Sequence, residues 1–181
     1  MKLNFLDEIP EVESQVEMDF VKIPAGGGCE SFWYGVTPVT EAQWAEVMGG
    51  PGKGSNRPKT EVSFSDAQEF CAKLGNGARL PTEMEQCWAL GREPQDLENY
   101  AVFEREEVVE VKTKLPNEYG LYDVRGLVWE WAETGKELKS MRGGSWFGSQ
   151  LGARAVFRNF ILPALRDYLT GFRLVVLRLP Q

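Results

Sequence analysis

Few side chains in this sequence could carry reactive chemistry. The chain has three cysteines, Cys29, Cys71 and Cys87, and no histidine. No two cysteines stand in a C-x-x-C spacing, so we interpret them as buried structural thiols. Without histidine, Ser-His and Cys-His nucleophiles, histidine-based zinc sites and the 2-His-1-carboxylate iron site are all excluded. The absence of histidine therefore excludes most common enzyme mechanisms for this chain.

Residues 143–171 carry side chains that are better suited to binding than to catalysis. The stretch has little periodicity, yet it is rich in aromatic and branched residues. A long irregular stretch in a compact domain is usually functional or disordered, and the apolar content argues against disorder. We therefore expect function to lie here.

Length, composition and charge limit the class of protein. The 181 residues include 43% hydrophobic residues, six tryptophans and ten phenylalanines, which fits one folded domain, residues 1–181. A net charge of −7 argues against a nucleic-acid partner. No apolar run could span a bilayer, and Met1–Phe20 carries six acids, unlike a secretory signal. We expect a monomer without membrane insertion, which reaches a virion or cell surface through a particle or partner.

Three stretches share the signature of a short helix. Each has a Ser or Thr followed three residues later by Gln or Glu, then apolar spacing, then a glycine. They run from Thr40 to Gly49, from Ser65 to Gly75 and from Thr82 to Gly91. The side chains expected to face inward are Trp44, Val47 and Met48 in the first, Phe70 and Leu74 in the second, and Met84, Cys87 and Trp88 in the third.

Strand-like segments lie near both ends of the chain. Residues 19–24 alternate loosely, and residues 172–179 are rich in β-forming residues, so we expect these two strands to pair. Glycine and proline crowd residues 25–28 and 49–58, which indicates loops. A further strand is possible at residues 108–111.

Six phrases occur in a fixed order that is similar to a known family. They are residues 62–67 (VSFSDA), 79–83 (RLPTE), 120–124 (GLYDV), 128–131 (VWEW), 142–146 (RGGSW) and 171–175 (GFRLV). Together they resemble the formylglycine-generating, or sulfatase-modifying factor, branch of the C-type lectin fold, over about residues 20–176. The resemblance implies an α+β domain, with short helices around a small antiparallel sheet, much irregular structure and paired termini.

Within these phrases, particular residues have expected structural roles. Trp129 and Trp131 fall on one side of an extended segment and are expected in an aromatic core, with Glu130 on the other side. Gly143 and Gly144 permit a close backbone approach before Trp146. Three arginines are expected to pair with carboxylates such as Glu83, Asp123 or Glu130; they are Arg79, Arg142 and Arg173.

The catalytic equipment that the resemblance implies is missing. Formylglycine-generating oxidases hold copper with a cysteine pair shortly after the Arg-Gly-Gly-Ser-Trp phrase, but residues 147–154 contain no cysteine. The related iron-dependent sulfoxide synthases need histidines. Family members often carry a calcium-binding Asn after the glycine that corresponds to Gly126, and here Leu127 offers no oxygen ligand. We therefore expect a non-catalytic chain with no metal and no cofactor.

The same scaffold is used by the variable proteins of diversity-generating retroelements, which this chain also resembles. In these proteins, template adenines are copied inaccurately, so AAC asparagine codons become NNC codons in the 3′ end of the gene. The resemblance implies a variable region at residues 142–175. Its fixed positions match Ala153, Arg154, Ala155, Arg158, Pro163, Arg166 and Gly171. The fixed arginines are expected to support the backbone through hydrogen bonds to carboxylates and carbonyls.

The positions that fall on template asparagines form the candidate ligand-binding set. NNC cannot encode Trp, Met, Lys, Glu or Gln, and none of these occurs at the thirteen positions. The set is Phe147, Gly148, Ser149, Gly152, Phe157, Asn159, Phe160, Ile161, Leu162, Leu165, Asp167, Tyr168 and Leu169. Large apolar groups on a rigid platform are typical of binding surfaces, so most of their side chains should be exposed.

Three functions are consistent with these residues. The first is a receptor-binding protein, with a macromolecular target, whose surface is diversified by a retroelement. The second is a degenerate formylglycine-generating-type oxidase that has moved its metal site. The third is a structural C-type lectin module with a buried, invariant C-terminal segment. Exposure of the thirteen positions and metal analysis separate them.

Overall fold

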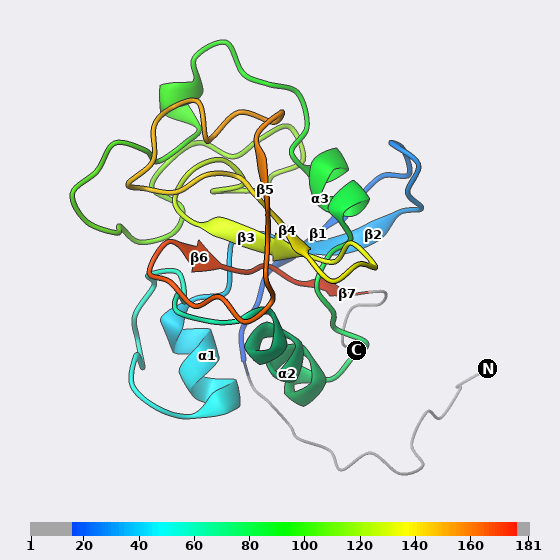
Figure 1. The fold of residues 1–181 in the computed structure, drawn as a ribbon, viewed down its shortest axis with the longest axis vertical. Helices are drawn as coiled ribbons and strands as arrows, with labels where there is room; N and C mark the ends of the chain where they lie inside the picture. The colour runs from blue at the N-terminus through cyan, green and yellow to red at the C-terminus, as the bar shows by residue number, and fades with distance from the viewer. Residues whose placement is uncertain (1–15, 177–181) are drawn as a thin grey trace.

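The computed structural model describes residues 16–176 and has the expected α+β architecture (Figure 1). Its elements, in chain order, are β1 (Phe20–Ile23), β2 (Phe32–Gly35), α1 (Glu41–Met48), α2 (Phe64–Leu74), α3 (Glu83–Ala89), the 3-10 helix η1 (Leu97–Asn99), β3 (Trp129–Ala132), β4 (Lys139–Arg142), β5 (Arg158–Ile161), β6 (Thr170–Gly171) and β7 (Val175–Val176).

The strands form two small sheets rather than one. One sheet has the order β1-β2-β7, and the other has the order β5-β4-β3-β6, in which β3 and β6 are parallel. The first and last described strands share a sheet but do not pair with each other, because β2 lies between them. Sequence reasoning missed β2, a four-residue aromatic segment that pairs with β1 just before it in the chain.

All three expected helices are present, and each begins with a capping box. Thr40 and Thr82 are the N-caps of α1 and α3, as predicted. The expected N-cap Ser65 is wrong: α2 is capped by Ser63, whose hydroxyl accepts a hydrogen bond from the amide of Asp66. The Ser63 amide in turn donates to the Asp66 carboxylate at 2.7 Å. An aspartate at this helix position therefore closes the box as glutamate or glutamine would.

Two expectations for the middle of the chain are wrong. Met84 and Cys87 of α3 are exposed, whereas Glu85 and Gln86 are buried. The burial is possible because Glu85 pairs with Arg79 and the amide of Gln86 donates to the Glu130 carbonyl. Residues 108–111 form no strand, and their valines instead pack against the cluster around Trp146.

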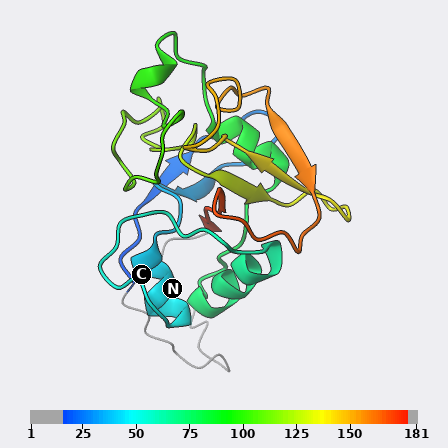
Figure 2. The same cartoon turned by 60° about the vertical axis from the view of Figure 1, so that its left-hand side comes forward.

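An aromatic core holds the sheets and the first two helices together. The rings of Trp44 and Phe70 stack at 5.6 Å, and Phe172 meets Phe70 edge-on at 5.3 Å. Phe64 meets the fully buried Trp131 in the same way at 5.9 Å. Helices α1 and α2 thus lie on one side of the sheets, and α3 lies on the other (Figures 1 and 2). Among residues 16–176, no helix is long and apolar enough to span a membrane.

Candidate binding surface

The candidate surface begins where β4 ends in the Arg-Gly-Gly-Ser-Trp phrase. Gly144 has a φ of 82°, and a Cβ atom there would lie 2.7 Å from the backbone carbon of Gly152. Only glycine lets the chain bring residues 149–152 so close to the end of β4. Beyond this turn, the chain returns as β5, which is the edge strand of its sheet and lies on the outside of the molecule (Figure 2).

None of the thirteen candidate positions is buried. The exposed ones include four aromatic side chains and Leu162, and Phe147 is the most exposed of these five at 61%. The full exposed group is Phe147, Ser149, Phe157, Asn159, Phe160, Leu162 and Tyr168. The predicted exposure of the large side chains is thus confirmed for Phe147, Phe157, Phe160 and Tyr168.

The other six positions are only half-exposed, including two for which exposure was predicted. Ile161 and Leu165 pack against the aromatic core, and Leu169 packs against the cluster around Trp146. Gly148, Gly152 and Asp167 make up the rest of this group. From Ile161 to Leu169, half-buried and exposed positions alternate, so part of the set faces inward.

Arginines placed between the candidate positions connect this segment to α2, to α3 and to the loop that follows α3. Arg154 contacts Glu93 at 3.1 Å, Arg158 contacts Glu83 at 2.9 Å, and Arg166 contacts Asp66 at 2.8 Å. The expectation that these arginines bind carboxylates is confirmed. Their side chains are 47–60% exposed, so each ion pair positions the chain more than it stabilises the fold.

Glu83 connects the candidate surface to the buried interior. Its Oε1 accepts from Arg158 and also, at 2.9 Å, from Arg142, whose side chain is almost fully buried. Arg142 donates a further bond to the carbonyl of Ala155. The Arg142–Glu83 pair was among those expected, whereas Arg79 pairs with Glu85 and not with any of the three carboxylates considered.

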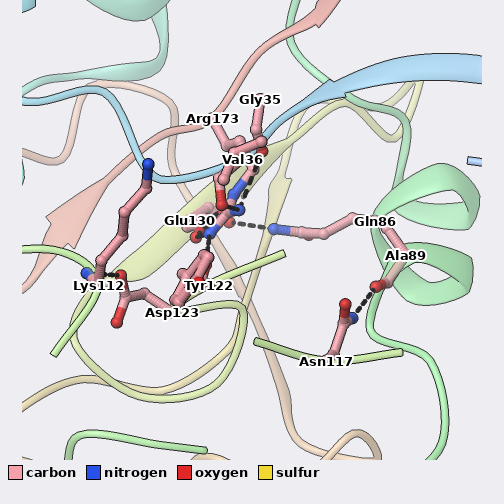
Figure 3. A network of polar contacts seen from close by, with 10 residues as sticks. All are labelled: Gly35, Val36, Gln86, Ala89, Lys112, Asn117, Tyr122, Asp123, Glu130 and Arg173. Atoms are coloured by element: carbon pink, nitrogen blue, oxygen red, sulfur yellow. Dashed lines mark hydrogen bonds and ion pairs between the residues drawn. The ribbon is translucent and has the colours of Figure 1, made fainter. Parts of the chain in front are cut away.

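A buried ion pair between Arg173 and Glu130 lies at the centre of the polar network in Figure 3. Arg173 donates to both carboxylate oxygens at 2.9–3.3 Å, and also to the carbonyls of Gly35, Val36 and Tyr122. Burial alone would lower the pKa of Arg173, but the Glu130 carboxylate raises it above its usual value. The sequence predicted that Arg173 pairs with a carboxylate such as Glu130 without assigning the partner, and the observed pair ties the two sheets together.

Asp123 is the unusual group of this network (Figure 3). It is buried, with a φ of 56°, and one carboxylate oxygen accepts from the Lys112 amide at 2.7 Å. The other oxygen has no partner among the described residues. Burial raises the pKa of Asp123 to about 6, and Glu130 adds to the rise, whereas the Lys112 amide and Arg173 oppose it.

The residues at the metal positions of the related enzymes do not fit a metal. Leu127 is fully buried and packs with Val102, Val128 and Trp146, so an apolar cluster occupies the place of an oxygen ligand. Both oxygens of Glu130 face the guanidinium of Arg173. No cation is needed to balance this carboxylate.

The cysteines differ from one another, which corrects the expectation of three buried thiols. Cys71 is buried, and burial raises its pKa to about 12. Cys29 is half-buried and Cys87 is exposed. The short glycine-rich hairpin before Cys29 and the outward face of α3 leave these two thiols near the surface.

Sequence reasoning also missed two exposed apolar residues in the candidate surface. Val156 is 81% exposed and Leu151 is 61% exposed, yet neither falls on a template asparagine. Their apolar neighbours in the sequence gave no signal that separates them from core residues. With them, exposed apolar side chains occur both before and after β5 in the sequence.

Comparisons with known proteins agree with this geometry. The model of the family described as "Sulfatase-modifying factor enzyme 1-like domain" matches residues 18–178. The "Inactive C-alpha-formylglycine-generating enzyme 2" of Mus musculus is 30% identical over 148 residues, covering 64% of this chain and 47% of the relative. The chain therefore spans about half the length of this curated relative.

Solved structures share the fold. "Treponema denticola variable protein 1" superposes with a TM-score of 0.73 at 24% identity, covering 90% of this chain and 93% of that chain. The "Major Tropism Determinant U1 Variant" superposes with a TM-score of 0.58 at 15% identity, covering 80% of this chain and 50% of the other. The expected C-type lectin type of fold, in its formylglycine-generating branch, is confirmed.

Proposed function

The chain belongs to the sulfatase-modifying factor enzyme 1-like domain family, and we propose that it is a non-catalytic protein that binds a macromolecular target. In this proposal, residues 142–175 present a surface that a retroelement diversifies. The thirteen candidate positions contact the target, and the scaffold beneath them stays constant.

One observation carries this proposal: the division of the segment between exposed and buried residues. The phrases that flank it are buried, from Met141 to Trp146 and from Thr170 to Val176. Between them, none of the thirteen positions is buried, and five present a large apolar side chain to solvent. Such a cluster of exposed apolar groups is typical of an interaction surface, because a soluble monomer rarely exposes it without use.

The relatives support the same function. The mouse relative is named inactive, and two of the structural neighbours are named a variable protein and a tropism determinant. The residues that would hold a metal in the related enzymes are absent here, which also supports a non-catalytic role. We propose that the target is not a nucleic acid. In this proposal, the protein binds its target as a monomer at a virion or cell surface and needs no cofactor.

The gene sequence tests the proposal directly. The thirteen codons should end in C or be readable as adenine substitutions of AAC. A near-copy of the 3′ end should lie beside a reverse transcriptase gene, and should match the codons of Arg154, Arg158, Pro163 and Arg166. Several candidate codons that end in G or A, without any near-copy, would remove the retroelement from the proposal. Binding would then be tested separately, by comparing natural variants of residues 142–175.

A further inference from the structure

A cavity of about 300 Å³ lies beside the C-terminal end of α3, outside the candidate binding surface. Leu115, Leu121 and Val124 give it apolar walls, and Tyr100 adds an aromatic ring. Arg125 is the buried cation of the lining. Apolar walls around a few polar groups are the usual composition of a small-molecule site.

Arg125 is only 2% exposed, but it has no carboxylate partner within 4.0 Å among residues 16–176. Its Nη2 donates to the carbonyls of Leu90, Gly91 and Arg92 at 3.3–3.5 Å, and its Nη1 donates to the Ala153 carbonyl at 3.4 Å. All four bonds are long for a charge-assisted donor. Burial accordingly lowers the pKa of Arg125.

These four bonds do not use all the N–H groups of the Arg125 guanidinium. A guanidinium has five N–H groups, and Nε of Arg125 donates to none of the described residues. The nearby Glu93 acts on Arg125 electrostatically but makes its ion pair with Arg154. A buried cation without a carboxylate in contact is costly, and a planar carboxylate is the group that matches its fork of donors. The contrast with Arg173 is direct, because Arg173 is equally buried but faces Glu130.

We propose that this cavity binds a small carboxylate with an apolar body, the carboxylate on Arg125 and the body between Leu115, Leu121 and Val124. The charged groups at the rim do not oppose this, because Glu118 faces Arg92 at 3.9 Å and the two charges offset each other. The site does not rest on the proposed function, because every residue that lines it precedes residue 142, although Arg125 also donates to the Ala153 carbonyl.

The test compares benzoate with benzamide, its neutral counterpart of the same shape. Thermal melting and calorimetric titration of the whole chain are carried out at pH 7 and constant ionic strength. We expect benzoate to raise the melting temperature in a saturable manner and benzamide to leave it unchanged. Phenylacetate and hexanoate extend the series to other apolar bodies.

Three substitutions locate the response. Leu115→Asp places a negative charge at the cavity, so the affinity for benzoate should fall at least tenfold. Because Leu115 is exposed, the variant should still fold. Leu138→Asp is the matched control, because Leu138 is also an exposed leucine but lies between β3 and β4, and it should respond like the unaltered chain. Arg125→Lys keeps the charge, removes the fork and should weaken binding.

Three results would overturn the proposal. One is the absence of a saturable response to all three carboxylates. Another is an equal response to benzoate and benzamide, which would assign the effect to the apolar walls alone. The third is an unchanged benzoate response in Leu115→Asp, which would place binding elsewhere. In each case, Arg125 would be a residue that only holds the end of α3 against Ala153.

Discussion

Nη1 of Arg158 and Oε1 of Glu83 lie 2.9 Å apart and join two residues that are 75 positions apart in the sequence. The contact connects β5, the exposed edge strand, to the first turn of α3. Arg142 reaches the same oxygen from the interior. Glu83 thus connects β5 to the buried interior, beside the Arg154–Glu93 and Arg166–Asp66 pairs, and the neighbours of Arg158 can change.

The two arginines on Glu83 should differ in their effect on stability. Arg142→Ala should lower the free energy of unfolding by about 2 kcal/mol or more, because Glu83 Oε1 keeps only its half-exposed partner Arg158 and the Ala155 carbonyl loses its donor. Arg158→Ala should cost less than about 1 kcal/mol, since its side chain is half-exposed. Urea denaturation of both variants measures the difference. Equal losses of stability in the two variants would show that Arg158 contributes as much to the fold as the buried Arg142.

The aromatic side chains should divide into core and surface. Trp146→Ala should cost about 3–5 kcal/mol because it opens a cavity in the cluster with Leu127. Phe160→Ala should stay within about 1 kcal/mol, because Phe160 is half-exposed and leaves no cavity. The same Phe160 change should weaken binding to the target by about 2 kcal/mol if it is an anchor. Melting curves test the first two values; similar losses in both variants would contradict the division.

Returning exposed positions to the template asparagine should leave the fold intact. The double variant Phe157→Asn and Leu162→Asn should melt within a few degrees of the unaltered chain, because surface changes cost about 0.5 kcal/mol each. Phe172→Asn is the control: it buries an amide in the aromatic core and should prevent stable folding. A collapse of the double variant would mean that the segment supports the core.

Asp123 should make stability depend on pH. Its pKa is about 6 in the folded chain, above the usual 3.8, so the folded state binds this proton more tightly than the unfolded state does. The stabilisation is complete below about pH 4 and is lost as the pH rises through about 6, by about 2–3 kcal/mol. Asp123→Asn keeps a residue that tolerates a φ of 56° and should remove this slope. Urea titrations between pH 4 and 7 compare the two slopes, and parallel curves would contradict the shift.

Two glycines with nearly the same φ separate backbone strain from close packing. Gly120, with a φ of 84°, has nothing within 4 Å of an added Cβ, so Gly120→Ala should cost about 1 kcal/mol. Gly144, with a φ of 82°, would place its Cβ against the backbone of Gly152 and Ala153, so Gly144→Ala should cost at least about 2 kcal/mol more. Thermal melts measure both. Equal losses would mean that residues 149–153 can move away.

Local sequence patterns by themselves determined the three helices and the first strand. Capping boxes located α1 and α3 because the interactions that start a helix lie within four residues of one another. The ordered phrases gave the family and the fold, and the missing histidine and cysteine ligands gave the non-catalytic expectation. The exposure of Phe147, Phe157 and Tyr168 was also predictable, because the resemblance marks positions that a scaffold tolerates changing.

Only the tertiary structure decided which elements and side chains meet. β2 lies between β1 and β7, and Arg79 forms its ion pair with Glu85 rather than with Glu83. The same holds for Ile161 and Leu165, which turn toward the core although their types match those of exposed neighbours. Strand order, ion pairs and the choice of which side chains of an irregular segment face the core depend on groups that are distant in the chain. Local spacing cannot rank these partners, because each choice is fixed by the packing of all the others.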